Sequence, residues 1–152
     1  MTSYVLDASV AAKWFLPADS EPLSAEALGL LRHYAKGDAN FLVPDLFFAE
    51  IADVLWKAER FARCDAAIAD AAIAKIIGSR FPTFPSATLI EPAVLLARAY
   101  GRTVCDCIYV ALAIQTKTHF ITADENRIMR YTRFGPTCQP RRCSSAVMRG
   151  RP

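Results

Sequence analysis

The most constraining feature of this sequence is an apolar segment near the N-terminus that runs directly into an acid. Residues 4–6 are strand formers, and Asp7 follows them. Residues 10–16 then show the pattern of a short helix, which Pro17 ends. Because ligands of open α/β sheets bind at the carboxyl ends of the strands, Asp7 is predicted to lie where such proteins place their chemistry.

The rest of the chain repeats this order of strands and helices. Such an order predicts a three-layer α/β/α fold with a central, mostly parallel sheet of four or five short strands flanked by helices. At 152 residues, a single domain is expected. Ser24 is a predicted N-cap, and Pro92 is the predicted first residue of a helix. The further predicted strands are 41–43, 88–90 and 119–122, and the further predicted helices are 24–36, 45–60, 65–79, 92–100 and 107–114.

Glu50 is a second candidate acid. It lies in the middle of a helix that is apolar on nearly all sides and is therefore predicted to be largely buried. A buried carboxylate costs several kcal/mol unless a cation or a hydrogen-bonding partner meets it. Asp53 is the competing acid on this helix, but it begins a polar face that Lys57 and Arg60 continue. We therefore rank Glu50 above Asp53.

Asp106 and Asp124 stand at comparable points of the chain. Asp106 opens an apolar helix, and Asp124 comes just after a predicted strand. Acids are also common at helix starts for purely structural reasons, so Asp7 and Asp124 are candidate N-caps as well. Thr103 and Asp106 likewise have the spacing of a capping box. Taken singly, Asp7, Asp106 and Asp124 can each be explained as a residue that caps a helix.

Taken together, the four acids indicate a metal site. If they converge at one sheet edge, each pair at ~4 Å repels by about 4 kcal/mol at an effective dielectric constant of ~20, and bound cations relieve this. Carboxylate oxygens suit Mg²⁺ or Mn²⁺, and His33 and His119 are not placed to join them. Such cations support hydrolysis of phosphoryl esters. The acids are Asp7, Glu50, Asp106 and Asp124.

The segments around these acids resemble the four acidic motifs of the PIN-domain family, and most closely those of VapC toxin ribonucleases from bacterial toxin–antitoxin pairs. The segments are V-L-D-A-S, A-E-I-A-D-V-L-W, C-D-C-I-Y-V-A-L-A and F-I-T-A-D-E-N. The resemblance covers roughly residues 4–134 and implies a PIN-like nuclease domain over 1–135. It implies that Asp7, Glu50, Asp106 and Asp124 hold Mg²⁺ or Mn²⁺ and catalyse endoribonuclease cleavage, with Ser9 and Thr122 as supporting hydroxyls that orient the acids.

The resemblance also implies partners. These are RNA, with tRNA or rRNA as the expected substrate, a second copy of the chain in a homodimer, and a cognate antitoxin whose C-terminal segment occupies the acidic groove. Cleavage of such RNA would inhibit translation. The high apolar content of residues 46–80 is compatible with a dimer interface and with a surface that binds the antitoxin.

The C-terminal end departs from the family pattern, in which a final strand closes the sheet. Seven Arg and no acid follow Asn126, whereas residues 1–126 hold 11 basic and 15 acidic residues, a net charge of −4. Residues 136–152 are predicted to form a basic tail, irregular or disordered, with at most one short edge strand. Such a tail is suited to phosphates.

Several classes of protein are disfavoured. No apolar run reaches the roughly 18 residues of a membrane helix, and the N-terminus lacks the features of a signal peptide, so a cytoplasmic protein is expected. Five cysteines in this spacing are predicted to be free thiols. A PIN-like RNA- or protein-binding module that cleaves nothing remains an alternative. A phosphatase with an aspartyl-phosphate would want an acid two residues after Asp7, where Ser9 stands.

Overall fold

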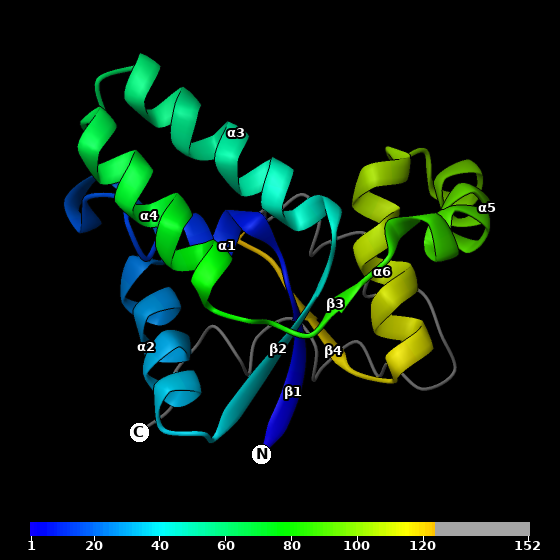
Figure 1. The fold of residues 1–152 in the computed structure, drawn as a ribbon. Helices are drawn as coiled ribbons and strands as arrows, with labels where there is room; N and C mark the ends of the chain where they lie inside the picture. Colours follow the sequence, from blue (N-terminus) through cyan, green and yellow to red (C-terminus); the bar gives the residue numbers. More distant parts are fainter. Residues whose placement is uncertain (124–152) are drawn as a thin grey trace.

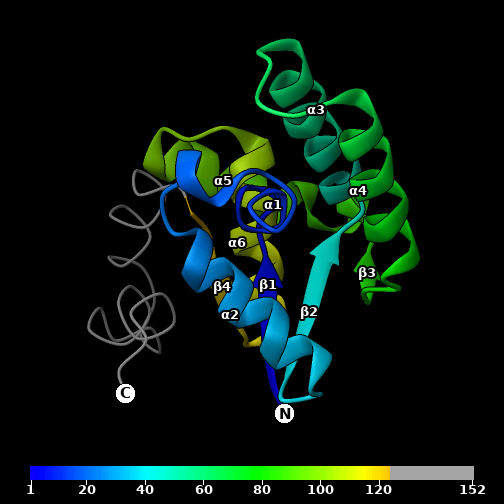
Figure 2. The ribbon, with the colours of Figure 1, turned by 90° about the vertical axis from the view of Figure 1, so that its left-hand side faces the viewer.

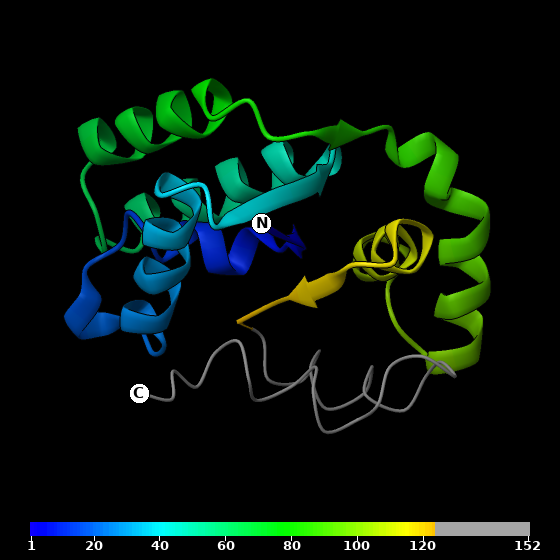
Figure 3. The ribbon, with the colours of Figure 1, turned by 90° about the horizontal axis from the view of Figure 1, so that it is seen from below.

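The computed structural model describes residues 1–123, which form three layers. A parallel sheet of four strands, in the order β3-β2-β1-β4, lies between α1–α4 on one face and α5 and α6 on the other (Figures 1 and 3). The predicted α/β/α architecture is confirmed. The strands are β1 (Thr2–Leu6), β2 (Ala39–Pro44), β3 (Thr83–Phe84) and β4 (His119–Ile121). The helices are α1 (Ala8–Ala12), α2 (Ser24–Ala35), α3 (Leu46–Arg60), α4 (Ala66–Gly78), α5 (Ile90–Tyr100) and α6 (Val104–Thr116), with the short 3₁₀ turns η1 (Ala18–Ser20) and η2 (Ser86–Leu89).

Strand β1 lies at the centre of the sheet. Val5 is aligned with Leu42 of β2 and with Phe120 of β4. Val5 and Leu6 point to opposite faces, and both are fully buried because helices cover both faces of the sheet. Leu6 is aligned with Ile121, so the residues that follow β1 and β4 emerge side by side at the carboxyl edge.

The core on the α1–α4 side of the sheet is built around Phe41 of β2. The ring of Tyr34 stacks on Phe41 with 5.2 Å between centroids, and Trp14 and Phe81 approach it at 5.7 and 5.9 Å. The indole N–H of Trp14 donates to the carbonyl of Ala27 at 2.8 Å, which joins α2 to the segment after α1. Figure 2 views this face, with α1, α2 and α4 in front of the strands. Aromatic packing thus fixes these helices on the sheet.

Helix α3 is less buried than the sequence predicts. Its buried side chains form a single stripe, whereas Ala49 is exposed and half of the Trp56 surface is accessible. The helix packs along one side against α1 and α4, and apolar residues beyond that contact stay in solvent. The buried stripe is Phe47, Ile51, Leu55 and Ala58.

The strand predicted at 88–90 is absent, and this prediction is wrong. Residues 86–89 form η2 instead, and β3 lies earlier in the chain. The Asp45 carboxylate accepts hydrogen bonds from the backbone N–H and the hydroxyl of Ser86, which holds the chain in a turn. Leu89 is then free to insert into the core, where it is fully buried.

Four helix starts differ from the predictions, and one of them is that of α6, which begins at Val104 and not at residue 107. Helix α1 begins at Ala8 and ends at Ala12, earlier than the predicted 10–16. Ser24 is the first residue of α2 and not its N-cap, because its hydroxyl donates to the Glu21 carbonyl at 2.8 Å. Pro92 is the third residue of α5, where the missing N–H also costs no intrahelical hydrogen bond.

Cys64, Cys105 and Cys107 are free thiols, as predicted. Cys107 is buried in the core, whereas Cys105 is exposed. Burial, together with the charges of nearby acids, raises the pKa of the Cys64 thiol. Among residues 1–123, no helix has both the length and the apolar character needed to cross a bilayer.

Candidate active site

The topology places three of the four predicted acids at the carboxyl edge of the sheet. Asp7 directly follows β1, and Glu50 is the fifth residue of α3, which begins just after β2. Asp106 is the third residue of α6, whose first turn lies at this edge because α6 runs back along the sheet into β4 (Figure 1). Asp124 lies outside the described residues.

The Asp7 carboxylate is held by donors from two segments. One oxygen, Oδ1, accepts from the backbone N–H of Ser9 at 3.3 Å, so Asp7 is the N-cap of α1, as its structural alternative predicted. The other oxygen, Oδ2, accepts from the Thr122 hydroxyl at 2.5 Å. Asp7 is only 1% exposed. An N-cap requires neither this burial nor a second donor from a distant segment. Capping of α1 alone therefore does not explain how firmly this carboxylate is held.

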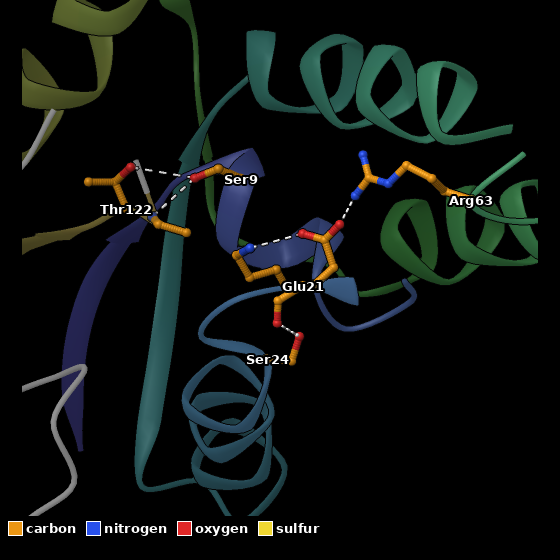
Figure 4. Close-up of polar contacts among 7 residues, drawn as sticks. Ser9, Glu21, Ser24, Arg63 and Thr122 are labelled. Carbon is orange, nitrogen blue, oxygen red and sulfur yellow. Dashed lines mark hydrogen bonds and ion pairs between the residues drawn. The ribbon is translucent and has the colours of Figure 1, made fainter. Parts of the chain in front are cut away.

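Both predicted supporting hydroxyls lie beside Asp7. The Ser9 Oγ is 3.4 Å from the Thr122 Oγ1 and accepts from the backbone N–H of Ala123 at 3.1 Å (Figure 4). The Asp7 backbone N–H also donates to the Ile121 carbonyl at 3.0 Å. The start of α1 is therefore tied to the chain just after β4.

Glu50 has a partner on another element. Its carboxylate is partly buried and accepts a hydrogen bond from the hydroxyl of Tyr109 in α6. Tyr109 itself is fully buried. The competing acid Asp53 is exposed and pairs with Lys57 at 2.6 Å along the surface of α3. Of the two acids on this helix, Glu50 is thus the one held by another element, whereas Asp53 pairs along its own helix.

Asp106 begins the face of α6 that carries Tyr109. Its backbone N–H donates to the hydroxyl of Thr103 at 3.1 Å, which is the N-cap half of the predicted capping box. The Asp106 side chain is half-buried and lies three residues before Tyr109, and residues at this spacing share one side of a helix. Asp106 and Glu50 are thus both neighbours of Tyr109.

The donor chemistry of these residues fits a hard divalent cation. Asp7, Glu50 and Asp106 offer carboxylate oxygens, the ligands that Mg²⁺ and Mn²⁺ prefer. Within residues 1–123, no three His, Cys, Asp or Glu side chains gather closely enough to form a metal-binding group. His33 is exposed beside Asp38, and His119 begins β4 at the opposite edge of the sheet.

The sequence did not reveal a second polar cluster beside the site. The carboxylate of Glu21 meets the ammonium of Lys13 at 3.1 Å and the guanidinium of Arg63 (Figure 4). Burial, and then the charge of Arg63, lower the pKa of Lys13, which is 8% exposed. The cluster joins the end of α1 to the turn between α3 and α4. The available signal in the sequence was Lys13, which follows two alanines of an apolar helix. A lysine buried at such a position needs an acid within reach.

These features define an α/β protein with an acidic site at the carboxyl edge of a parallel sheet. The PIN domain family model matches residues 4–133, so the chain belongs to the PIN-domain family, whose members are in general nucleases. The predicted family is therefore confirmed.

Two solved structures show the same fold. PAE2754 from Pyrobaculum aerophilum is 22% identical, with a TM-score of 0.61 over 85% of this chain and 79% of that one. VapC20 from Mycobacterium tuberculosis, described as a toxin that cleaves the sarcin-ricin loop, is 19% identical, with a TM-score of 0.60 over 83% of this chain and 92% of that one. A search of curated proteins found no match.

Proposed function

We propose that this protein is a cytoplasmic, Mg²⁺- or Mn²⁺-dependent endoribonuclease and the toxin of a toxin–antitoxin pair. Its substrate is RNA, with tRNA or rRNA favoured, and its cleavage stops translation. Membership of the PIN-domain family supports nuclease chemistry. The toxin assignment rests on the motifs around the acids and on the likeness of fold to VapC20.

The observation that carries the proposal is the Asp7 carboxylate. It is buried at the edge where ligands of parallel sheets bind, and Thr122 and Ser9 fix both of its oxygens. A buried carboxylate positioned in this way is an oxygen ligand whose orientation is set before a cation arrives, which lowers the cost of binding.

Each acid has a role in this proposal. Asp7, Glu50, Asp106 and Asp124 hold the cation and form the catalytic group, and Ser9 and Thr122 orient Asp7. When bound, the cation supplies activation of water and stabilisation of charge on the phosphodiester. Hydrogen bonds from neighbouring elements hold two of these carboxylates in place, since the Thr122 hydroxyl donates to Asp7 and the Tyr109 hydroxyl donates to Glu50.

The proposed protein partners are a second copy of the chain and a cognate antitoxin. Apolar side chains are exposed on the outer helices in support of such contacts, among them Trp56 of α3, Ile77 of α4 and Leu95 of α5. The C-terminal segment of the antitoxin is proposed to cover the acidic edge and so to block the substrate.

Cleavage of end-labelled total tRNA and of structured rRNA fragments tests the proposal. The purified chain, free of antitoxin, is incubated with Mg²⁺, Mn²⁺ or EDTA, with Asp106→Asn in parallel. We expect cleavage with either cation, none with EDTA, and a loss of at least about 100-fold in Asp106→Asn, because one charged ligand is removed.

Asp53→Asn is the matched control for this experiment. Asp53 is an exposed carboxylate of α3 whose ionic partner is the surface residue Lys57, so its loss leaves the acidic edge intact. Its cleavage rate should equal that of the parent chain. Equal rates in the parent and in Asp106→Asn would overturn the assignment of the site, and no cleavage by folded parent protein would favour a PIN-like binding module.

A further inference from the structure

We propose that Tyr109 is a positioning residue for the cation site. Its buried hydroxyl holds the Glu50 carboxylate of α3 against the side of α6 from which Asp106 projects, so that both acids face one cation. This inference rests on the proposed function. It adds a residue that is neither an acid nor one of the hydroxyls beside Asp7.

Glu50 lies at the margin of the buried stripe of α3 and is itself partly buried. The buried stripe of α3 includes Phe47 and Ile51, and Glu50 stands between them in sequence, next to the exposed Ala49. A hydrogen bond from another helix, donated by the Tyr109 hydroxyl, orients this carboxylate.

Tyr109 is placed to act on both acids. It is fully buried in α6, its ring lies 5.9 Å from that of Phe120 in β4, and it is three residues after Asp106 on the same side of the helix. The backbone of Asp106 is held by the cap at Thr103. The ring anchors the hydroxyl in the core, and the hydroxyl reaches Glu50, so the position of α3 relative to α6 sets the spacing of the two carboxylates.

The chemistry of the site explains why a tyrosine and not a phenylalanine occupies this position. A buried tyrosine hydroxyl needs a partner, and here its partner is a carboxylate of the proposed cation site. A residue that orients a metal ligand through a hydrogen bond changes metal affinity by about 10- to 100-fold when it is removed. The hydroxyl of Tyr109 is expected to act in this range.

The test removes only the hydroxyl. Tyr109→Phe and the parent chain are titrated with Mn²⁺ without RNA, with the free ion followed by electron paramagnetic resonance, and RNA cleavage is measured over a range of Mn²⁺ concentrations. We expect the Mn²⁺ dissociation constant to rise by about 10-fold or more. The cleavage rate at saturating Mn²⁺ should recover most of the parent value, because no ligand has been removed.

Tyr34→Phe is the matched control. The Tyr34 hydroxyl is also part-buried and donates across the fold, to the Ser79 carbonyl at 3.1 Å, far from the acidic edge. Its removal also costs the fold a tyrosine hydrogen bond, here to a neutral carbonyl, and the Mn²⁺ dissociation constant should stay at the parent value. If the role of Tyr109 is purely structural, both variants should lower the melting temperature, and both should bind Mn²⁺ as tightly as the parent chain does.

A second variant tests whether Tyr109 acts through Glu50, and it also serves if Tyr109→Phe does not fold. Glu50→Asp keeps the charge but draws the carboxylate back by one methylene, away from the hydroxyl, so Mn²⁺ affinity should fall by about 10-fold. The double variant should bind Mn²⁺ no more weakly than Glu50→Asp.

The possible outcomes separate the two proposals. Mn²⁺ affinity at the parent value in Tyr109→Phe, or in Glu50→Asp, overturns the role of Tyr109 while RNA cleavage by the parent chain still supports the proposed function. Fully additive losses in the double variant show that Tyr109 does not act through Glu50, and they overturn the inference too. A parent chain that binds no Mn²⁺ and cleaves no RNA overturns both proposals.

Discussion

A single hydroxyl, that of Thr122, donates a hydrogen bond to the Asp7 carboxylate in a buried setting. Thr122→Val keeps the shape of the side chain but removes the donor to Oδ2. We expect the free energy of unfolding at pH 7 to fall by about 1.5–3 kcal/mol, because the lost bond is to a buried charge. Urea unfolding followed by circular dichroism measures this change.

Thr116→Val is the comparison for this prediction. The Thr116 hydroxyl donates to the neutral Leu112 carbonyl within α6 at 2.7 Å, so its loss should cost about 1 kcal/mol or less. Equal losses in the two valine variants would mean that Asp7 gains no special stabilisation from Thr122.

For single residues, the sequence predicts the candidate metal-binding acids better than it predicts the residues that donate hydrogen bonds to them. Asp7 was found because an acid after an apolar strand is visible in one segment, and Glu50 because an acid interrupts an apolar helix. Tyr109 as the partner of Glu50 was missed, since the two residues are 59 positions apart and only the folded chain brings them together at the carboxyl edge of the sheet. The need of a buried tyrosine for an acceptor was the available signal.

At the scale of elements, one short contact joins the β2–α3 turn to the chain after β3. Asp45 accepts from the backbone N–H and hydroxyl of Ser86, and Leu46 donates its N–H to the Ser86 hydroxyl at 3.3 Å. These bonds lower the pKa of the Asp45 carboxyl, the hydroxyl bond most. The contact therefore stabilises the fold only while Asp45 is ionised.

Ser86→Ala tests the pH dependence of this contact. Because the folded pKa of Asp45 is depressed, its contribution is fully present above the unfolded pKa of about 3.9 and is lost as pH falls through the folded pKa. We expect the variant to be less stable than the parent by about 1 kcal/mol or less at pH 7, since Asp45 is exposed. Urea unfolding at pH 7, 4 and 2.5 should show this difference shrinking in acid.

Thr88→Val supplies the reference for Ser86→Ala. The Thr88 hydroxyl donates to the uncharged Pro85 carbonyl at 2.8 Å in the same turn, so its loss should not depend on pH over this range. A difference for Ser86→Ala that stays constant from pH 7 to pH 2.5 would contradict the role of the ionised Asp45.

The same turn shows where prediction of elements from the sequence fails. Thr88, Leu89 and Ile90 have the composition of a strand, but Asp45, which lies 41 residues before Ser86, captures the chain and turns it into η2. Long, strongly periodic helices such as α2 and α4 were predicted closely because their signals are local. The order of strands and helices, and with it the parallel sheet, followed from the same local patterns.

At the scale of the whole molecule, charge is divided along the chain. Residues 1–126 carry a net charge of −4, and the seven Arg that follow Asn126 have no acid among them. An acidic site attracts cations but repels phosphates, so binding of RNA by this chain requires positive charge from elsewhere. The arginines near the C-terminus are the largest unopposed source of it in the sequence.

Replacing four of these arginines tests their role without shortening the chain. Arg141, Arg142, Arg149 and Arg151 are changed to Gln in the Asp106→Asn background, which prevents cleavage during binding. Each arginine that neutralises a phosphate of single-stranded RNA contributes about 0.7 to the slope of log affinity against log salt. We expect weaker binding at low salt, a slope that is smaller by as much as about 3, and affinities that converge at high salt, all measured by fluorescence anisotropy.

Lys36→Gln is the control for a change of charge alone. Lys36 is exposed at the end of α2, next to the amino edge of the sheet, and so lies away from the acidic site. Its slope should match that of the parent. If the four-arginine variant also keeps the parent slope, then the basic end does not neutralise phosphates, and the charge that draws RNA to the acidic edge comes from the domain itself or from a second copy of the chain.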